Sequence, residues 1–232
     1  MDHSKVDASM ALLQQAEAEF APDIVFACSF GAEDVVMLDL ISRSARAITI
    51  VTLDTGRLPQ QTYDVMDACR TRYGLPVEVY CPDAAEVEAM VREHGMNLFR
   101  DSVEKRKRCC EIRKIHPLRR ALAGRKAWVT GVRREQADSR QQMAAIEDDV
   151  AFGIKKFNPL IEWSQADIWA YIRENDVPYN ALHDEHYPSI GCAPCTRAIA
   201  VGEDPRAGRW WWEQEEGVAE CGLHASPIKR KS

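Results

Sequence analysis

Four short stretches of apolar residues, separated by segments with helical patterns, constrain the fold of this chain more than any other feature. These stretches are DIVFACSF at 23–30, AITIVTL at 47–53, LPVEVYC at 75–81 and KAWVTGV at 126–132. Stretches of this length that are rich in Val and Ile are typical of buried strands, and the helical patterns between them indicate βαβ units. Such units build a parallel sheet with helices on both of its faces. The sequence therefore predicts an α/β fold around a parallel sheet.

The segments around these strands carry helix signals. We expect a first helix over 7–20, and a second helix directly after the first strand, where apolar residues recur at helical spacing. The residues of that second helix that we expect to face the sheet are Val35, Val36, Leu38 and Ile41. The helix after the second strand is expected to end at Gly74, because glycine commonly ends helices. A later helix is expected to begin at the capping residue Ser164 and to end before Pro178.

The organisation of the chain is simple, with no internal repeat and no low-complexity linker. The 232 residues, 46% of them hydrophobic, are enough to build a core. We expect one domain over 1–202 and a flexible tail over 203–232, because the tail has no strand pattern and little periodicity. We also expect a homo-oligomer, although no motif defines the number of subunits.

Composition and charge favour a cytoplasmic protein with a small anionic ligand. The N-terminus has no apolar segment suited to a signal peptide, and no stretch of about 18 apolar residues suggests a membrane span. The formal net charge of -6 argues against a general nucleic-acid binder, so we expect neither a nucleic-acid nor a membrane partner. Basic residues are instead concentrated in KRKRCCEIRK at 105–114, at Arg133 and Arg134, and in the tail. This local concentration indicates a small anion.

Three predicted strand ends carry residues suited to bind an anion at the carboxyl edge of the sheet. The first strand leads into CSFGAED at 28–34, the second into LDTGR at 53–57 and the fourth into TGVRREQADSR at 130–140. Hydroxyl groups, glycines that allow close approach and the free N–H groups of a helix start favour phosphate at such ends. The candidate binding residues are Ser29, Phe30, Gly31, Asp54, Thr55, Gly56, Arg133, Arg134 and Arg140. Each loop taken alone also fits an ordinary strand-to-helix turn with solvated arginines.

Four of the eight cysteines form a pattern that can hold a metal centre. Cys109 and Cys110 are adjacent, and the later stretch GCAPC supplies Cys192 and Cys195. Four thiolates are a full set of ligands for an iron–sulfur cluster or for structural zinc, and the residues alone leave both open. A thioredoxin-like redox pair is a third interpretation of the CAPC stretch, although that motif is expected after an early strand. The cysteines expected to be small buried apolar residues are Cys28, Cys69 and Cys81.

The eighth cysteine, Cys221, lies in the tail outside every apolar pattern. Beside Gly222 it is expected to be exposed and mobile. An incidental surface thiol is one interpretation, and a nucleophile delivered by a flexible arm is the other. His224 or bound cations would raise its thiolate fraction, whereas Glu220 would lower it. The WWW triplet at 210–212 is expected to seat the tail on the rest of the protein.

Taken together, these motifs resemble the assimilatory sulfonucleotide reductases, specifically the iron–sulfur adenylylsulfate (APS) reductases that use thioredoxin. The resemblance covers nearly the whole chain. Its motifs are SFGAEDVV at 29–36, LDTGRL at 53–58, KRCCEIRKIHPL at 107–118, TGVRREQ at 130–136, NPLIEWSQADIWAYI at 158–172, GCAPCTR at 191–197, RAGRWWWE at 206–213 and ECGLH at 220–224.

The resemblance implies a Rossmann-like fold of the adenine nucleotide α-hydrolase type, related to the PP-loop ATPases. Phe30 stands where the PP-loop ATPases usually carry glycine, which speaks against ATP hydrolysis. The resemblance also implies a [4Fe-4S] cluster on the two cysteine pairs, with Cys221 as the nucleophile. Because no thioredoxin- or glutaredoxin-like domain follows the tail, the electrons are expected to come from a separate thioredoxin.

The implied reaction is the reduction of APS to sulfite and AMP, a step of sulfate assimilation toward cysteine. Cys221 attacks the sulfur, AMP leaves, and thioredoxin releases sulfite from the resulting S-sulfocysteine. Negative oxygens screen that sulfur, so the thiolate needs cations nearby. The residues expected to supply them are Lys114, Arg206 and Arg209, and His224 is a further catalytic candidate.

Three other functions stay open. Within the family, the alternative is a reductase that prefers PAPS, the 3'-phosphorylated substrate. Outside it, the alternative is a zinc-stabilised nucleotide- or nucleic-acid-binding module without redox chemistry. A PP-loop ATPase that modifies RNA is the third, and the Phe30 loop disfavours it.

Overall fold

The computed structural model describes residues 3–137 and 140–213 of the chain. These residues form two compact units, each assembled from separate stretches of sequence. The sheet unit comprises 3–52, 62–78 and 122–180, and the cysteine unit comprises 53–61, 79–121 and 181–213. The boundary expected at residue 202 does not separate the two units, because 203–213 belong to the cysteine unit. The remainder of the expected tail lies outside the described residues.

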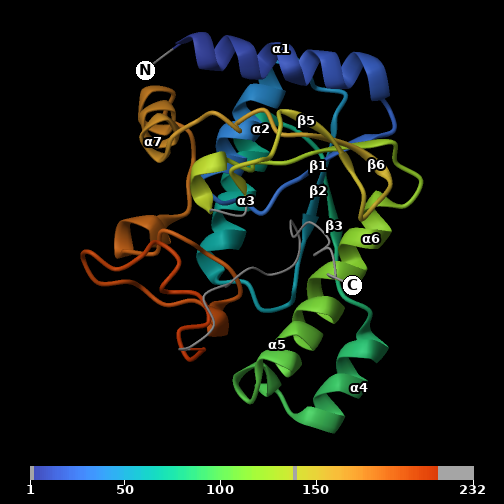
Figure 1. The fold of residues 1–232 in the computed structure, drawn as a ribbon, viewed down its shortest axis with the longest axis vertical. Helices are drawn as coiled ribbons and strands as arrows, with labels where there is room; N and C mark the ends of the chain where they lie inside the picture. Colours follow the sequence, from blue (N-terminus) through green and yellow to red (C-terminus); the bar gives the residue numbers. More distant parts are fainter. Residues whose placement is uncertain (1–2, 138–139, 214–232) are drawn as a thin grey trace. The chain divides into compact units, whose positions relative to one another are not determined.

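A six-stranded sheet has the strand order β3-β2-β1-β4-β6-β5 (Figure 1). Its strands are β1 (Ile24–Ala27), β2 (Thr49–Leu53), β3 (Val77–Tyr80), β4 (Ala127–Val129), β5 (Ile146–Asp149) and β6 (Ile154–Phe157). Strand β1 pairs in parallel with β2 and β4, β4 pairs in parallel with β6, and β5 runs antiparallel to β6. The predicted α/β fold is therefore confirmed. The chain order reverses between β1 and β4, where open α/β sheets bind their ligands.

The sequence prediction misses strands β5 and β6 and the one antiparallel pairing that they form. Their stretch at 146–157, IEDDVAFGIKKF, is rich in charged residues and lacks a clear apolar alternation. Strand β5 lies at the edge of the sheet, and ion pairs join it to β6. Asp148 contacts Lys155 at 2.7 Å, and Glu147 contacts Lys156 at 3.0 Å. Cross-strand charge pairs thus hold a hairpin that apolar patterning does not reveal.

Four helices pack mainly in the sheet unit. They are α1 (His3–Phe20), α2 (Ala32–Ser44), α3 (Gln60–Tyr73) and α7 (Gln165–Glu174). Helix α1 begins earlier than expected, and its additional turn buries Val6. Helix α3 is followed by Gly74 as predicted, with a φ of 61°. Ser164 caps α7 as predicted, since its Oγ accepts a hydrogen bond from the Asp167 N–H at 3.1 Å.

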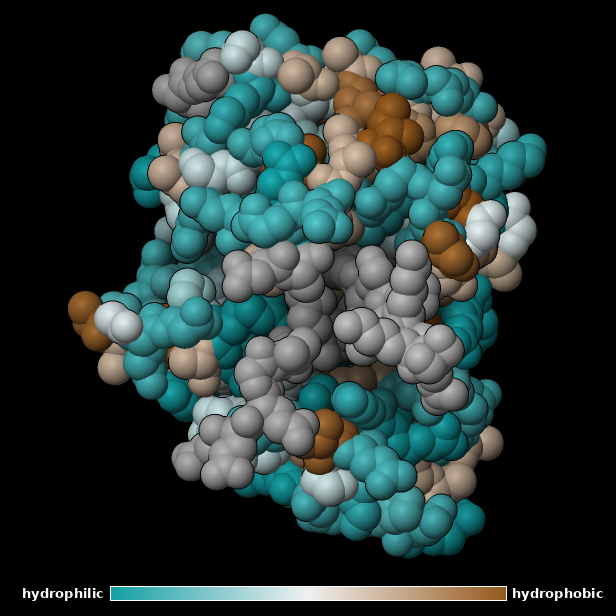
Figure 2. Space-filling view, in the orientation of Figure 1, coloured by the Kyte–Doolittle hydropathy of each residue, from teal (hydrophilic) through white to brown (hydrophobic). Residues whose placement is uncertain are grey.

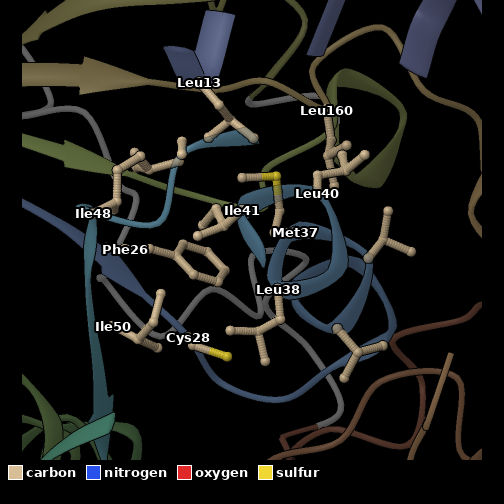
Figure 3. Packing of buried hydrophobic residues seen from close by; sticks show 14 of the residues in the cluster. Leu13, Phe26, Cys28, Met37, Leu38, Leu40, Ile41, Ile48, Ile50 and Leu160 are labelled. Atoms are coloured by element: carbon tan, nitrogen blue, oxygen red, sulfur yellow. The ribbon is translucent and has the colours of Figure 1, made fainter. Parts of the chain in front are cut away.

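The apolar face of α2 forms much of the core of the sheet unit (Figure 3). The residues predicted to face the sheet, Val35, Val36, Leu38 and Ile41, are all buried. Figure 3 shows the ring of Phe26, from β1, among side chains of α2 and the sheet that include Leu38, Ile41 and Ile50. Each such side chain contributes roughly 1.5–3 kcal/mol when fully buried. Helices α1 and α7 both pack against α2.

The prediction that three cysteines are buried apolar residues holds for two of them. Cys28 and Cys69 are buried as predicted. Cys81 is exposed, so its prediction was wrong. It follows β3, which lies at the edge of the sheet and leaves Val79 56% exposed. An edge strand has a neighbour on one side only, so less of the structure covers the residues around it.

The cysteine unit is built around α4 (Ala84–His94), α5 (Val103–Cys110) and most of α6 (His116–Leu122), which are green in Figure 1. A π-helical turn, Glu111–Ile115, joins α5 directly to α6. Asp83 caps α4 and Ser102 caps α5, each by accepting a hydrogen bond from a backbone N–H of the first turn. The buried apolar cluster of this unit contains Met90, Leu98, Phe99, Cys109, Ile112, Cys195 and Trp210.

The described residues contain no helix long and apolar enough to cross a membrane. On the face drawn in Figure 2, hydrophilic side chains predominate, and hydrophobic ones occur in small groups. Two of the most exposed large apolar side chains, Val150 and Val201, lie in separate turns.

Candidate active site

The loop at 29–34, directly after β1, is closed by hydrogen bonds between its two ends. Asp34 Oδ2 accepts hydrogen bonds from the Ser29 backbone N–H at 2.5 Å and from the Ser29 hydroxyl at 2.6 Å. Burial raises the pKa of Asp34 to about 6, although the hydrogen bonds from Ser29 oppose this rise. Ser29 was predicted to offer its hydroxyl to an anion. To do so, the hydroxyl has to rotate away from Asp34.

Phe30 gives this loop an uncommon backbone conformation. Its φ is 59°, in the left-handed region that favours glycine, and its ring is buried. A residue with a Cβ costs roughly 1–2 kcal/mol in this conformation. The next residue, Gly31, is the N-cap of α2, so the loop ends where that helix presents its free N–H groups. A strained loop that leads into a helix N-terminus is typical of an anion-binding site.

Gly131 brings the loop after β4 against the loop after β1. A Cβ at Gly131 would clash with the Asp34 carboxylate and would lie 3.3 Å from the Cβ of Glu33. Glycine is therefore needed for this approach. The structure thus joins two of the three loops that the sequence placed at one sheet edge, because β1 and β4 are neighbours.

Arg133 fastens the same two loops by an ion pair. Its side chain is buried, and its Nε donates to Glu33 Oε1 at 2.9 Å. Its Nη1 donates to Glu135 at 3.1 Å and to the carbonyl of Trp163 at 3.4 Å. Arg133 was predicted to bind the anion, and that role stays a prediction. The structure adds a role for Arg133 in holding the loops together.

Arg134 and Arg140 also lie near this edge and are already bonded to protein acceptors. Arg134 donates to the Glu162 carboxylate at 2.5 Å and to the Met143 carbonyl at 3.1 Å. Arg140 is buried and donates to Gln136 Oε1.

The loop after β2 belongs to the cysteine unit and packs against the second cysteine pair. Thr55 is buried, and its Oγ1 lies 3.2 Å from Cys192 Sγ. The carbonyl of Arg57 accepts a hydrogen bond from the Ala193 N–H at 2.8 Å. Thr55 was predicted to bind the anion, and that role stays a prediction.

A tight turn gives the loop after β2 its shape. Asp54 Oδ1 accepts a hydrogen bond from the Gly56 N–H at 2.8 Å, and Gly56 has a φ of 70°. Arg113 Nη1 donates to the Thr55 carbonyl at 2.7 Å. The predicted binding residues Asp54 and Gly56 therefore shape the loop, and Arg113 fixes it to the helical stretch that carries the first cysteine pair.

The four cysteines of the predicted metal set line one small cavity in the cysteine unit. Cys109 and Cys110 end α5, and Cys192 and Cys195 lie at a short 3-10 turn. The other residues that line this cavity are Arg57, Phe99, Arg106, Arg113, Lys114 and Pro194. None of the four cysteines is in a disulfide. The structure thus brings together two pairs that are far apart in the sequence. We call this cavity and its four cysteines the cysteine site.

Burial disfavours ionisation of these thiols. Burial raises the pKa of Cys195 to about 12, and the charge of the neighbouring cysteines adds to the rise. Burial also raises the pKa of Cys109, while Arg113 lowers it. Buried thiolates therefore need positive charge nearby, and the arginines and Lys114 that line the cavity supply part of it. Within 3–137 and 140–213, no group of three or more His, Cys, Asp or Glu side chains is arranged to hold a metal ion.

Lys114, the predicted catalytic cation, lines the same cavity. It lies on the π-helical turn that continues α5. A π-helical turn carries one more residue than an α-helical turn and is often found at functional sites. It changes the direction in which Lys114 leaves the helix relative to the cysteines.

The stretch at 206–213 lies beside the second cysteine pair. The Trp210 N–H donates to the Cys195 carbonyl at 3.3 Å, and Trp210 is buried. Arg209 lies over the Trp210 ring at 4.8 Å and packs directly on Gly191, where a Cβ would clash with its guanidinium. The structure therefore brings Arg209 to the cysteine site, and the predicted seating by the tryptophans is seen at Trp210. Arg206 is half-buried in the same stretch.

Sequence reasoning missed Arg106, which is 2% exposed. Its Nε donates to Glu213 Oε1 at 2.6 Å, and its guanidinium lies over the Trp210 ring at 4.3 Å. A signal was present in the sequence. Arg106 precedes Cys109 by three positions and Cys110 by four, so on a helix it lies near both cysteines, whereas Lys105 and Lys107 each have such a spacing to only one of them.

Cys221 and His224, the predicted nucleophile and its neighbour, lie outside the described residues. Their roles stay predictions.

The sheet order and the loops at its carboxyl edge define an α/β protein of the adenine nucleotide α-hydrolase type. The family model described as "Phosphoadenosine phosphosulfate reductase domain" matches residues 23–198. The chain belongs to this family.

Its relatives match along nearly their whole length. A protein of Allochromatium vinosum named adenosine 5'-phosphosulfate reductase is 52% identical over 217 residues, covering 94% of this chain and 84% of the relative. A protein of the same name from Burkholderia cepacia is 50% identical over 225 residues, covering 97% and 89%.

Solved structures agree with this assignment. The phosphate complex of phosphoadenylyl-sulfate (PAPS) reductase from Candida auris superposes with a TM-score of 0.71 at 31% identity, covering 83% of this chain and 90% of that one. FMN adenylyltransferase from Candida glabrata has a TM-score of 0.56 at 16% identity, covering 82% and 62%. The second likeness concerns the fold alone.

Proposed function

We propose that this chain reduces adenosine 5'-phosphosulfate (APS) to sulfite and AMP in sulfate assimilation, with thioredoxin as the reductant. The observation that carries the proposal is the similarity, along nearly the whole chain, to proteins named adenosine 5'-phosphosulfate reductase. The chain is thus an oxidoreductase that acts on sulfur. We place the reaction in the cytoplasm, where thiols such as those of the cysteine site are kept reduced.

The cysteine site fits a [4Fe-4S] cluster held by Cys109, Cys110, Cys192 and Cys195. The four thiols share one cavity, and buried donors around it lack acceptors. The donors without a hydrogen-bond partner include Arg106 Nη1, Arg113 Nε, Trp210 Nε1 and Trp212 Nε1. Buried donors are normally satisfied, so this set suits an anionic group with several acceptor sulfurs. When bound, the cluster supplies anchoring bonds and a local negative charge.

The cluster is the group that we propose for these cysteines, and a structural zinc ion on the same four thiols is the alternative left open by the sequence. Iron and acid-labile sulfide, measured after anaerobic purification, test this assignment, and zinc without either contradicts it.

In the sheet unit, we propose that the loops at 29–34 and 131–136 bind the anionic groups of the nucleotide. Gly31 begins the helix N-terminus there, and Gly131 keeps the two loops in contact. Phe30 replaces the glycine expected for ATP pyrophosphatase chemistry, which fits a substrate that is not hydrolysed at its α-phosphate.

The first chemical stage is nucleophilic attack by Cys221 on the sulfur of APS. The Cys221 thiolate forms an S–S bond, the bond from sulfur to the bridging phosphate oxygen breaks, and AMP leaves with the electron pair. We propose that Lys114, Arg206 and Arg209 neutralise the sulfate oxygens, and that His224 favours the thiolate. Cations that meet the developing charge contribute most in a site shielded from water.

The second stage returns the enzyme to its starting state. A thioredoxin thiolate attacks the sulfur of Cys221, and sulfite leaves with the electron pair of the S–S bond. The second thioredoxin thiol then displaces Cys221, so the dithiol is oxidised to a disulfide and supplies both electrons. No electron has to pass through the cluster.

Replacement of Cys221 by serine tests the mechanism. We expect loss of sulfite formation to the background of the assay, with APS binding and the iron and sulfide content retained. The control is Cys81→Ser, because Cys81 is an exposed thiol of the described residues. Sulfite formation in Cys221→Ser at a rate near that of the control would show that another residue is the nucleophile.

The substrate preference is tested by steady-state turnover with APS and with PAPS. The structure of a PAPS reductase with a TM-score of 0.71 makes PAPS the competing substrate to measure. We expect a higher kcat/KM for APS. A clear preference for PAPS would leave the family assignment intact and overturn the substrate assignment.

A further inference from the structure

Arg106 and Arg113 are the buried cations of the KRKRCCEIRK stretch, at 2% and 8% exposed, and Arg106 is the more buried of the two. Lys105 pairs with Asp101 at 2.9 Å, and Arg108 pairs with Glu111 at 2.9 Å, in both cases with exposed side chains. Arg106 points inward and is 2% exposed. An isolated buried guanidinium is costly, so its surroundings have to compensate its charge.

The described contacts compensate Arg106 only in part. Its Nε donates to Glu213 at 2.6 Å, and the ring of Trp210 lies 4.3 Å from its central carbon. Its Nη1 is buried and has no hydrogen-bond partner. The side chain also lines the cavity of the cysteine site. A buried donor that is left unsatisfied costs about 1–3 kcal/mol, and more if it is charged, so a missing acceptor is indicated.

Charge balance points to the same acceptor. Arg106 and Glu213 together are neutral, whereas a [4Fe-4S] core with four thiolates carries about -2. Without Arg106, the half-buried carboxylate of Glu213 would add to that negative charge. Arg106 thus offsets one anion with Nε and still offers a donor to a second anion.

We infer that Arg106 is a positioning residue of the cysteine site, whose Nη1 donates to a sulfur of the bound cluster while its Nε holds Glu213. This inference rests on the cluster of the proposed function. It makes Arg106 the link between the first cysteine pair and the stretch at 206–213, which carries Arg206 and Arg209.

The test uses the full-length protein, reconstituted anaerobically with iron and sulfide, and four variants. Loss of the visible absorbance of the cluster is followed after addition of a ferrous chelator. We expect Arg106→Gln to lose iron at least about tenfold faster than the wild type, as for other groups that orient metal ligands. Arg106→Lys is expected to lose iron at an intermediate rate. Lysine keeps the positive charge, but it cannot donate to two different groups from a planar guanidinium. Arg108→Gln, the matched exposed control, is expected to match the wild type within about twofold.

The Glu213→Gln variant distinguishes two roles of Arg106: an electrostatic interaction with the cluster, and an ion pair that only holds Glu213. If Arg106 does no more than hold Glu213 by an ion pair, Arg106→Gln and Glu213→Gln both lose that ion pair and release iron equally fast. If Arg106 serves the cluster, Glu213→Gln keeps the cation and retains iron. The reduction potential of the cluster then shifts in opposite directions, downward in Arg106→Gln and upward in Glu213→Gln, because net charge near a cluster sets its potential.

Each outcome decides for or against the inference. Iron release by Arg106→Gln at the wild-type rate overturns it, as does equal release by Arg106→Gln and Glu213→Gln. If Arg106→Gln does not fold by circular dichroism, retention of iron and a raised potential in Glu213→Gln support it, and rapid loss overturns it. A wild type that converts APS to sulfite without iron also overturns it. A wild type that holds iron, shows these variant effects and does not reduce APS leaves the inference standing and removes the proposed function.

Discussion

Phe30 combines a buried ring with a backbone conformation that suits glycine. Replacement by alanine removes the ring and keeps the left-handed backbone, so we expect a loss of about 3–5 kcal/mol of unfolding free energy. Replacement by glycine removes the same ring and relieves the backbone. We therefore expect Phe30→Gly to be more stable than Phe30→Ala by about 1 kcal/mol, measured by denaturant unfolding.

Phe26 provides the matched control, since it is equally buried but lies in β1. There the order of the two variants reverses. The unfolding free energy of Phe26→Ala is expected to be higher than that of Phe26→Gly by roughly 0.5–1 kcal/mol, because glycine weakens a strand. The same order at both positions would contradict a strained backbone at Phe30.

The raised pKa of Asp34 leads us to expect that the free energy of unfolding depends on pH. Burial raises its pKa to about 6 in the folded state, above the ordinary value of 3.8 that applies when the chain is unfolded. The folded state therefore binds more protons between these values, so the stability that Asp34 contributes is fully present below pH 3.8 and is lost as the pH rises through about 6. Relative to Asp34→Asn, the wild type is expected to lose on the order of 2–3 kcal/mol between pH 4 and 7. Parallel curves for the two proteins, from urea unfolding at several pH values, would rule this out.

At the scale of single residues, the sequence predicted which residues lie together better than it predicted the contacts that they make. The four cysteines, Lys114 and the loop at 29–34 follow from motif and position. The contact between Gly131 and Asp34 does not, because it depends on how closely two loops approach across the sheet. The burial of Arg106 was overlooked despite its helical spacing from the cysteines, because arginine is rarely buried and the surrounding basic residues suggest an exposed face.

Gly208 sets the course of the chain element that carries the tryptophans. A Cβ at this position would clash with the carbonyl oxygen of Arg197, and the Gly208 carbonyl accepts a hydrogen bond from the Arg197 N–H at 2.9 Å. Backbone atoms cannot move aside as a flexible side chain can. We expect Gly208→Ala to destabilise the cysteine unit by about 1–3 kcal/mol and to change the tryptophan fluorescence. Ala207→Ser, which adds one atom at a half-buried neighbour, is the control, and a similar effect of both would contradict the clash.

At the scale of elements, apolar periodicity predicted the strands of the sheet centre and the helices that cover it. It failed at the hairpin of β5 and β6, where charge pairs replace apolar alternation. It also gave no sign of the π-helical turn Glu111–Ile115, because the sequence pattern of a single widened turn hardly differs from that of an α-helix.

At the scale of the whole molecule, variants of Lys114 and Lys105 test whether a lysine of this basic stretch takes part in catalysis or only adds surface charge. Lys114 lines the cysteine site, whereas Lys105 is exposed and paired with Asp101. We expect Lys114→Ala to lower kcat for sulfite formation by about 100-fold or more, as for the loss of one group that stabilises developing charge. Lys105→Ala is expected to stay within about twofold of the wild type. If kcat falls equally in the two variants, Lys114 acts only as part of the surface charge of this stretch.

The division into two units was not foreseen, because each unit is built from stretches that alternate along the chain. Sequence reasoning follows the chain and so predicted one domain with a tail. The units follow contacts between distant stretches, which no local pattern records.

The interleaved course of the cysteine unit has a consequence during synthesis. Its parts come from 53–61, 79–121 and 181–213, so the ribosome has to deliver nearly the whole chain before the unit can close. Until then, Cys109 and Cys110 have emerged without Cys192 and Cys195, and Arg106 has emerged without Glu213. Contacts between such distant stretches form late, because long loops have to close first. Newly made chains therefore pass through a period in which the thiols of Cys109 and Cys110 are exposed without the second cysteine pair, and protection from oxidation matters most then.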